Sequence, residues 1–160
     1  MILYSKGKKL DDIDKAILQL LQAEGRLSNV EIGQQVNLSP PAVHARIKQL
    51  EQLGYIRGYV ALLEREQLGY DMVCFVNVRL QLHQLEQVKQ FRETVLGMSE
   101  VLDCHHVTGN YDYLLKVLVQ NHEDLEDFVL HRLTPIPGIE RIYTSVVLSE
   151  IKSTTMLPVK

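Results

Sequence analysis

Apolar residues in the first third of the chain recur at helical spacing and predict three short helices. The apolar stripe of the first helix is Ile13, Ile17, Leu20 and Leu21. Asp11 stands where its side chain can cap the start of this helix. Gly25 follows as an expected stop, since glycine accepts the conformation that many helix ends need.

The second helix has a complete start signal in Ser28 and Glu31, which are spaced as a capping box. Leu27 and Ile32 flank the cap and can pack on each other as a hydrophobic staple. We expect Asn37 to end the helix after about two turns. The apolar contacts expected from this helix are Val30, Ile32 and Val36.

The third helix is predicted over residues 40–53, with Ser39 as its N-cap, Pro40 in its first turn and Gly54 as its stop. Its expected buried stripe is Val43, Ile47, Leu50 and Leu53. At 100° per residue, the opposite face holds Pro41, His44, Ala45, Lys48, Gln49 and Gln52.

The second and third helices are joined by residues 37–39 alone, which is the plan of a helix-turn-helix. Residues 39–50 contain no Asp or Glu, as a helix that enters the major groove of DNA requires. A three-helix bundle with a merely solvated basic face is the alternative. The candidate DNA-contacting residues are Ser39, Pro41, His44, Arg46, Lys48 and Gln49. Arg46 lies beside the apolar stripe, which favours a phosphate contact or an internal ion pair over base reading.

Residues 54–63 are β-prone and contain glycine, so a strand is expected there, followed by a linker through residue 70. Strands and helices then alternate in the order β-α-β-β-α-β, which is the ferredoxin-like pattern of an α+β domain. The expected strands are 72–80, 101–108, 113–119 and 142–151. The expected helices contain Leu85, Val88, Phe91, Val95 and Leu96 before Gly97, and Leu125, Phe128, Val129 and Leu133 before Pro135.

Both sides of the expected strands carry apolar residues, and this pattern predicts a partner. In the strand 113–119, Leu114 and Leu118 lie on one side and Tyr113, Leu115, Val117 and Val119 on the other. In the last strand, Ile142, Val146 and Leu148 lie opposite Tyr143, Val147 and Ile151. Two helices cover one face of a four-stranded antiparallel sheet, so we expect the second face to pack on another copy in a symmetric dimer.

Charge and composition narrow the function. Residues 1–60 carry 8 basic and 6 acidic side chains, a net of +2, which leaves 9 basic and 14 acidic, a net of −5, for residues 61–160. The basic end is the one with the expected helix-turn-helix. Neither a long apolar run nor a secretion signal is present, so a cytoplasmic protein with reduced thiols at Cys74 and Cys104 is expected.

An enzyme is not expected, because the chain has no phosphate-binding loop, dinucleotide motif or nucleophile elbow. Cys104, His105 and His106 suggest a metal site, but neighbouring strand residues point to opposite faces. Cys104 and His106 alone supply too few ligands for a closed zinc site, so neither a metal nor another cofactor is expected.

Taken together, six segments resemble the Lrp/AsnC (feast/famine) family of transcriptional regulators in their order and spacing. They are residues 10–14, 25–32, 38–47, 54–59, 107–115 and 137–148. The resemblance implies a winged-type helix-turn-helix domain at 1–60, a hinge at 61–70, an effector-sensing and oligomerising domain at 71–152 and a tail at 153–160. It also implies dimers that often assemble to octamers, bind and bend promoter DNA at the nucleoid, and hold an amino acid between dimers.

The resemblance also implies an effector loop of Thr108, Gly109, Asn110, Tyr111 and Asp112, together with Thr144 and Ser145 on the last strand. Backbone N–H groups around Gly109 are suited to an amino acid's carboxylate, and Asp112 to its ammonium group. Gly109-Asn110 is equally an ordinary hairpin turn, in which Asp112 bonds only backbone. The alternative function is an architectural protein that wraps DNA without any effector.

Overall fold

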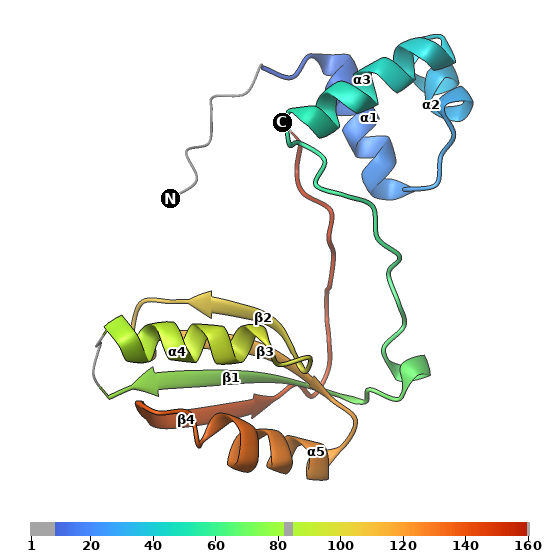
Figure 1. Ribbon diagram of the computed structural model, residues 1–160. Coiled ribbons are helices and arrows are strands. Elements are labelled where there is room, and N and C mark those ends of the chain that lie inside the picture. The colour runs from blue at the N-terminus through green and yellow to red at the C-terminus, as the bar shows by residue number, and fades with distance from the viewer. Residues whose placement is uncertain (1–8, 82–84, 160) are drawn as a thin grey trace. The chain divides into compact units, whose positions relative to one another are not determined.

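The computed structural model describes residues 9–81 and 85–159, which form two compact units (Figure 1). One unit runs to Leu62 and also includes the chain from Lys152 onward. The other unit spans Leu63–Ile151. The C-terminal segment, expected as a separate tail, is therefore part of the N-terminal unit.

The N-terminal unit contains α1 (Asp12–Ala23), α2 (Asn29–Val36) and α3 (Pro40–Gln52), as the sequence predicts. Asp11 caps α1 by accepting the Asp14 N–H at 2.7 Å. Ser28 and Glu31 form the expected capping box of α2, and Asn37 ends that helix in the left-handed conformation. The fully buried core residues of the unit are Ile17, Ile32, Val43 and Leu50.

Three local expectations in this unit are wrong. Glu24, in extended conformation, ends α1, and Gly25 is not among the residues with positive φ. Val30 is 52 % exposed, because it lies on the outer side of the short α2. Leu53 is 45 % exposed, since α3 ends at Gln52 and the chain turns away through Gly54 at φ +77°.

The segment after α3 is irregular, not the strand that the sequence suggests. Tyr55 and Ile56 donate backbone hydrogen bonds to Leu50, after which the chain runs without helix or strand to a short 3-10 turn at Glu66–Leu68. A strand needs a neighbour to receive its backbone hydrogen bonds, and none lies beside residues 57–63 in the described part of the chain.

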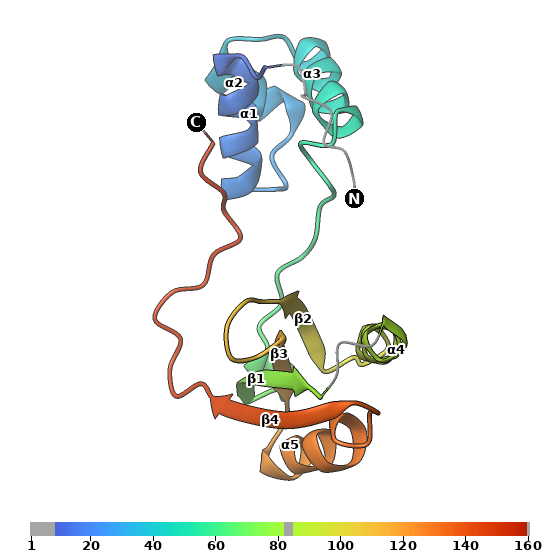
Figure 2. The ribbon, with the colours of Figure 1, turned by 90° about the vertical axis from the view of Figure 1, so that its left-hand side faces the viewer.

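The second unit has the predicted ferredoxin-like order, with four strands in one antiparallel sheet ordered β2-β3-β1-β4. The strands are β1 (Met72–Leu80), β2 (Val101–His106), β3 (Tyr113–Val119) and β4 (Ile139–Val146). The helices are α4 (Leu85–Leu96) and α5 (His122–Asp127), and the latter continues as a π-helix through Phe128–Leu133. Figure 2 shows both helices on the same side of the sheet.

Strict alternation in β1 and β3 builds the core of this unit. Val76, Val78, Leu115 and Val117 are fully buried against the helices, where Phe91 and Phe128 pack on them. The opposite sheet face holds side chains that remain partly exposed, among them Phe75 at 38 % and Tyr143 at 57 %. One sheet face is thus bare in the single chain, as predicted.

The helix α4 begins at Leu85 and ends at Leu96, as expected, and these two residues are 85 % and 87 % exposed. Two strand bounds and one helical turn in the second unit differ from expectation. β2 stops at His106, because the Val107 N–H turns to the Asp112 carbonyl and closes a loop. β4 begins at Ile139 and stops at Val146, which leaves Leu148 and Ile151 outside the sheet and more than 90 % exposed. The π-helical turn has no counterpart in the expected pattern.

None of the helices in the described residues is long and apolar enough to cross a bilayer.

Candidate functional site

The outer face of α3 is polar and exposed. Pro41, His44, Lys48 and Gln49 are all exposed, while Val43 and Leu50 hold the opposite face of the helix in the core. Along this helix the first acidic residue is Glu51, in the last turn. The face therefore offers hydrogen-bond donors and a positive charge without a carboxylate in its N-terminal half, which suits the edges and phosphates of duplex DNA.

Ser39 is exposed at the N-cap position of α3, but its side chain makes no capping hydrogen bond. This differs from α1 and α2, in which Asp11 and Ser28 cap through their side chains. The first N–H groups of a helix bind anions. The N-terminus of α3, with an uncommitted hydroxyl, is thus suited to a DNA phosphate.

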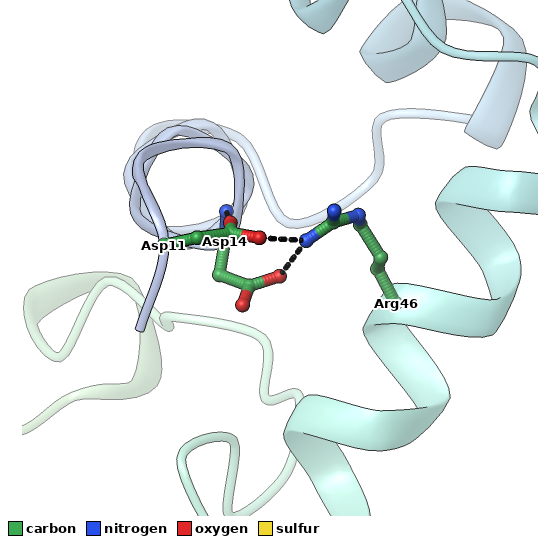
Figure 3. Close-up of polar contacts among 3 residues, drawn as sticks. All are labelled: Asp11, Asp14 and Arg46. Carbon is green, nitrogen blue, oxygen red and sulfur yellow. Dashed lines mark hydrogen bonds and ion pairs between the residues drawn. The ribbon is translucent and has the colours of Figure 1, made fainter. Parts of the chain in front are cut away.

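Arg46 points toward the start of α1, where it meets Asp11 and Asp14 (Figure 3). Its Nη1 atom donates to Asp11 Oδ2 at 2.7 Å and to Asp14 Oδ1 at 2.6 Å. The Asp14 side chain is 12 % exposed, and Asp14 is the buried charged residue of the described chain. Of the two alternatives that the sequence left open for Arg46, the structure has the internal ion pair.

The ion pairs perturb both partners in the expected directions. The hydrogen bond from the Asp14 backbone, followed by that from Arg46, lowers the pKa of Asp11. The same contacts with Asp11 and Asp14 raise the pKa of Arg46. Arg46 therefore joins α3 to α1 as a permanent cation and helps to set the angle at which α3 is presented.

The turn between α2 and α3 depends on a close approach at Gly33. A Cβ atom at this position would lie 2.5 Å from the Leu38 carbonyl oxygen, far inside a normal contact. Gly33 thus allows the backbone after α2 to fold back directly into α3. Sequence reasoning missed this residue, although a glycine inside a helical pattern was the available signal.

The loop between β2 and β3 is closed by backbone hydrogen bonds and by the Asp112 carboxylate. Asp112 Oδ2 accepts the Leu80 N–H at 2.8 Å, and the Asp112 N–H donates to the Val78 carbonyl at 2.9 Å. Gly109 adopts φ +117°, a conformation that favours glycine. The Asp112 side chain thus fastens the loop to the end of β1, whereas the sequence suggested a bond to the backbone of its own turn or to a ligand.

A polar cavity of about 240 Å³ lies between this loop and the ends of β1 and β4. Its lining residues are Arg79, Leu80, Gln81, Gly109, Asn110, Asp112 and Glu140. Arg79 Nε lies 3.1 Å from Glu140 Oε2, and both side chains are about half exposed. The Arg79 cation and the Glu140 anion thus lie side by side at the cavity wall. Together they are complementary to the carboxylate and the ammonium group of a free amino acid.

The structure brings only part of the predicted effector residues to this cavity. Gly109, Asn110 and Asp112 line it, whereas Thr108, Tyr111, Thr144 and Ser145 are not among its lining residues. Tyr111 instead lies near Tyr143, with 6.4 Å between ring centroids. Thr144 and Ser145 pair with Val76 and Phe75, farther along β4 than Glu140.

Sequence reasoning missed Arg79 as a residue of this cavity. The alternation of β1 places Arg79 on the face of the sheet that is not covered by helices. Its position opposite Arg141 and beside Glu140 depends on the pairing of β1 with β4, which the sequence does not specify.

Cys104 and His106 lie on the side of β2 that faces α4, with the His106 ring stacked on Tyr113 at 5.1 Å. Burial raises the pKa of the Cys74 and Cys104 thiols. The positive charge of Arg92 opposes part of the rise at Cys104. Within residues 9–81 and 85–159, no group of three or more metal-ligating side chains is arranged to hold an ion.

Each of the two units matches a known protein family. Residues 10–57 match the family described as winged helix-turn-helix DNA-binding, and residues 73–157 match the Lrp/AsnC ligand binding domain. The leucine-responsive regulatory protein of Escherichia coli K12 is 38 % identical over 154 residues, which cover 96 % of this chain and 94 % of that protein.

Solved structures give the same result. A transcriptional regulator from Neisseria meningitidis, solved as a complex with L-Met, superimposes with a TM-score of 0.90 at 39 % identity and covers 94 % of this chain and 97 % of its own. An AsnC family transcriptional regulator from Agrobacterium tumefaciens has a TM-score of 0.88 at 32 % identity, with 93 % and 97 % covered.

Proposed function

The chain belongs to the Lrp/AsnC family of transcriptional regulators, and from that premise we propose how its two units divide the work. It is a DNA-binding regulator with a winged helix-turn-helix and a ligand-binding domain, and its function is regulatory and not enzymatic. The proposal concerns which residues contact DNA, what the ligand is and how copies assemble.

In this proposal α3 is the recognition helix and lies in the major groove of promoter DNA. His44 and Gln49 bond base edges, Lys48 bonds guanine or a phosphate, Pro41 contacts the groove wall, and Ser39 bonds a phosphate at the helix start. The support is the exposure of all these residues on a face that carries no acidic residue before Glu51 in the last turn. Arg46 is a positioning residue, because its guanidinium is held by Asp11 and Asp14.

The proposed ligand is an amino acid, bound at the cavity beside Gly109. Its carboxylate takes the place of Glu140 against Arg79 and receives backbone N–H groups of the loop, and its ammonium group binds Glu140 and Asp112. In this exchange the Arg79–Glu140 ion pair is replaced by two ion pairs. Arg79 then pairs with the carboxylate of the amino acid, and Glu140 pairs with its ammonium group. The observation that carries the proposal is the Arg79–Glu140 pair at the wall of a cavity that Gly109 also lines.

The Neisseria meningitidis relative was solved with L-Met, so L-methionine is the first candidate effector. The cavity of about 240 Å³ is small and open in the single chain. A neighbouring copy would therefore complete it, as expected for a ligand held between dimers. Thr144 and Ser145 then act from the strand, through contacts in the assembly.

The bare sheet face is the proposed dimer surface, with Phe75, Leu114, Leu118 and Tyr143 at its apolar positions. A second copy of the same face removes this surface from water and makes a symmetric interface. Dimers then assemble further, for which an octamer is the expected size. The assembly acts on chromosomal DNA in the cytoplasm, at the nucleoid.

A thermal-shift panel of the twenty amino acids at millimolar concentration tests the ligand proposal. A ligand that binds the folded form raises Tm by mass action. We expect one or a few amino acids to raise it, and Glu140→Gln to remove the rise while Glu150→Gln keeps it. A flat panel would contradict the amino-acid proposal and support the architectural alternative, provided that the protein still binds DNA.

A further inference from the structure

Gln22, in the last turn of α1, binds the backbone of a residue 135 positions away in the chain. Its side-chain oxygen accepts the Leu157 N–H at 2.6 Å, and its side-chain N–H donates to the Leu157 carbonyl at 3.1 Å. A primary amide is both donor and acceptor, so it satisfies both backbone groups of one residue. Glutamate and lysine side chains lack one of these two functions.

The Gln22 contact lies at the edge of a groove in the N-terminal unit, with a cavity of about 670 Å³. Leu18 and Leu21 of α1 form one wall, and residues 55–60 form another. Leu157, Pro158 and Val159 close the cavity from a third side. The groove is therefore largely apolar, and the Gln22 amide at its edge hydrogen-bonds a peptide backbone.

Residues 55–60 follow α3 after Leu53 and Gly54, and Ile56 among them packs against the core of the N-terminal unit. In the described chain, Tyr55 and Ile56 bond the Leu50 carbonyl, and the Tyr59 hydroxyl donates to Glu51 Oε1 at 3.0 Å. No helix or strand includes them. The C-terminal segment thus supplies a wall of the groove that holds this part of the chain against α1.

The docked segment is held lightly. Leu157 remains 74 % exposed and Met156 50 %, whereas the core residue Ile17 is fully buried. Among the described residues, the contact consists of the two Gln22–Leu157 hydrogen bonds and of the cavity wall formed by Leu157, Pro158 and Val159. Such a contact forms and opens far more easily than the core does.

We propose that residues 152–159 are a releasable strap, and that the groove between α1 and residues 55–60 is a peptide-binding surface for this strap of the same chain. With the strap docked, the DNA-binding unit consists of two separate parts of the sequence. The unit 63–151 is then inserted between them and attached at both of its ends. Release of the strap loosens residues 55–60 and, through Leu50 and Glu51, the end of the recognition helix.

Hydrogen exchange on the full-length chain tests the strap without any DNA or effector, so the result does not depend on the proposed function. Gln22→Ala should raise exchange at residues 55–60 by about threefold or more, as local opening becomes easier. Gln19→Ala is the matched control, because Gln19 is exposed on the same helix. Equal exchange in the two variants would overturn the proposal.

Peptide complementation supplies a second test. In a chain shortened after Ile151, exchange at residues 55–60 should rise, and a synthetic peptide of residues 152–159 should reverse the rise in a saturable way. The same peptide N-methylated at Leu157 lacks the N–H that Gln22 accepts, and should fail. Failure of the unmodified peptide, or equal success of the methylated one, would overturn the proposal.

Mixing separates a strap of the same chain from a strap exchanged between copies. The shortened chain has an intact groove and no strap, and the wild-type chain mixed with it holds its strap in its own groove. The proposal predicts no recovery of protection in the shortened chain after mixing at micromolar concentration. Recovery would show that the groove takes the strap of a second copy and would overturn the proposal.

Discussion

The guanidinium of Arg46 on α3 and the carboxylate of Asp14 on α1 meet at 2.6 Å, across 32 residues of sequence. Asp11, which caps α1, accepts from the same nitrogen at 2.7 Å. The helix that presents the exposed polar face is thus tied to the start of the first helix by charge as well as by the apolar core. This ion pair distinguishes Arg46 from the exposed residues around it on α3.

Replacing Arg46 with Ala should destabilise the N-terminal unit by about 1–3 kcal/mol, because Asp14 would be left largely buried without its partner. Arg46→Lys should recover part of the loss because it keeps the positive charge. The recovery should be incomplete because lysine lacks the planar guanidinium group that bonds both carboxylates. Calorimetry of the full-length chain measures both. Lys48→Ala, an exposed change on the same helix, should stay within about 0.5 kcal/mol. An unchanged Tm for Arg46→Ala would contradict the positioning role.

Lys48→Ala should weaken binding to duplex DNA that the protein itself has selected from a random pool. A lysine that contacts a phosphate contributes about 0.9 to the slope of log affinity against log salt, so the slope should fall by that amount. A lysine that contacts guanine would instead relax the sequence preference at one position. Lys89→Ala removes the same charge from α4 and is the control. Equal affinities for the two variants would exclude the proposed orientation of α3.

Gly33→Ala should lower stability by about 1–3 kcal/mol, because the added methyl group meets the Leu38 carbonyl oxygen at 2.5 Å. Alanine is otherwise the better helix former, so a loss would show that the close approach outweighs propensity. Gly58→Ala is the matched control, since a Cβ atom there meets nothing within 4 Å. Urea unfolding followed by circular dichroism compares them. A more stable Gly33→Ala variant would show that the turn adjusts without strain.

The stabilising effect of Asp11 should depend on pH. Its folded pKa lies below the ordinary value of 3.8, so its contribution is present above that pH and is lost as pH falls through the lowered folded value. Asp11→Asn keeps a good cap but removes the charge, and it should lower Tm at pH 7. The difference from the wild type should disappear once the pH has fallen below the lowered folded pKa of Asp11. Asp12→Asn, which loses an exposed pair with Lys15, should change little at either pH.

Local signals in the sequence were enough for most of the helices and strands and for the exposed polar face of α3. The Ser28–Glu31 box and Asn37 act within a few residues, and alternation alone separates Leu115 from Leu114. Exposure of His44, Lys48 and Gln49 follows from helix geometry once Val43 and Leu50 are buried. Function followed from the combined motifs, and the family comparisons confirm it.

Apart from the local contact at Gly33, the site features that sequence reasoning missed depend on partners far apart in the chain. Strand register decides that Arg79 meets Glu140, and one shifted residue would turn Arg79 to the other face. The Gln22–Leu157 contact links opposite ends of the sequence through a backbone, which leaves no residue pattern to find. The loss of a strand after α3 has the same origin, since a strand exists only with its neighbour.

One titration tests the central claim that an amino acid controls DNA binding. Fluorescence anisotropy gives the Kd for the selected duplex at fixed salt, with and without L-methionine or another amino acid that raises Tm. We predict a change in Kd of about fivefold or more, the lower range of coupling between two sites, and its loss in Glu140→Gln. DNA binding that is unchanged by saturating amounts of all twenty amino acids would contradict the claim.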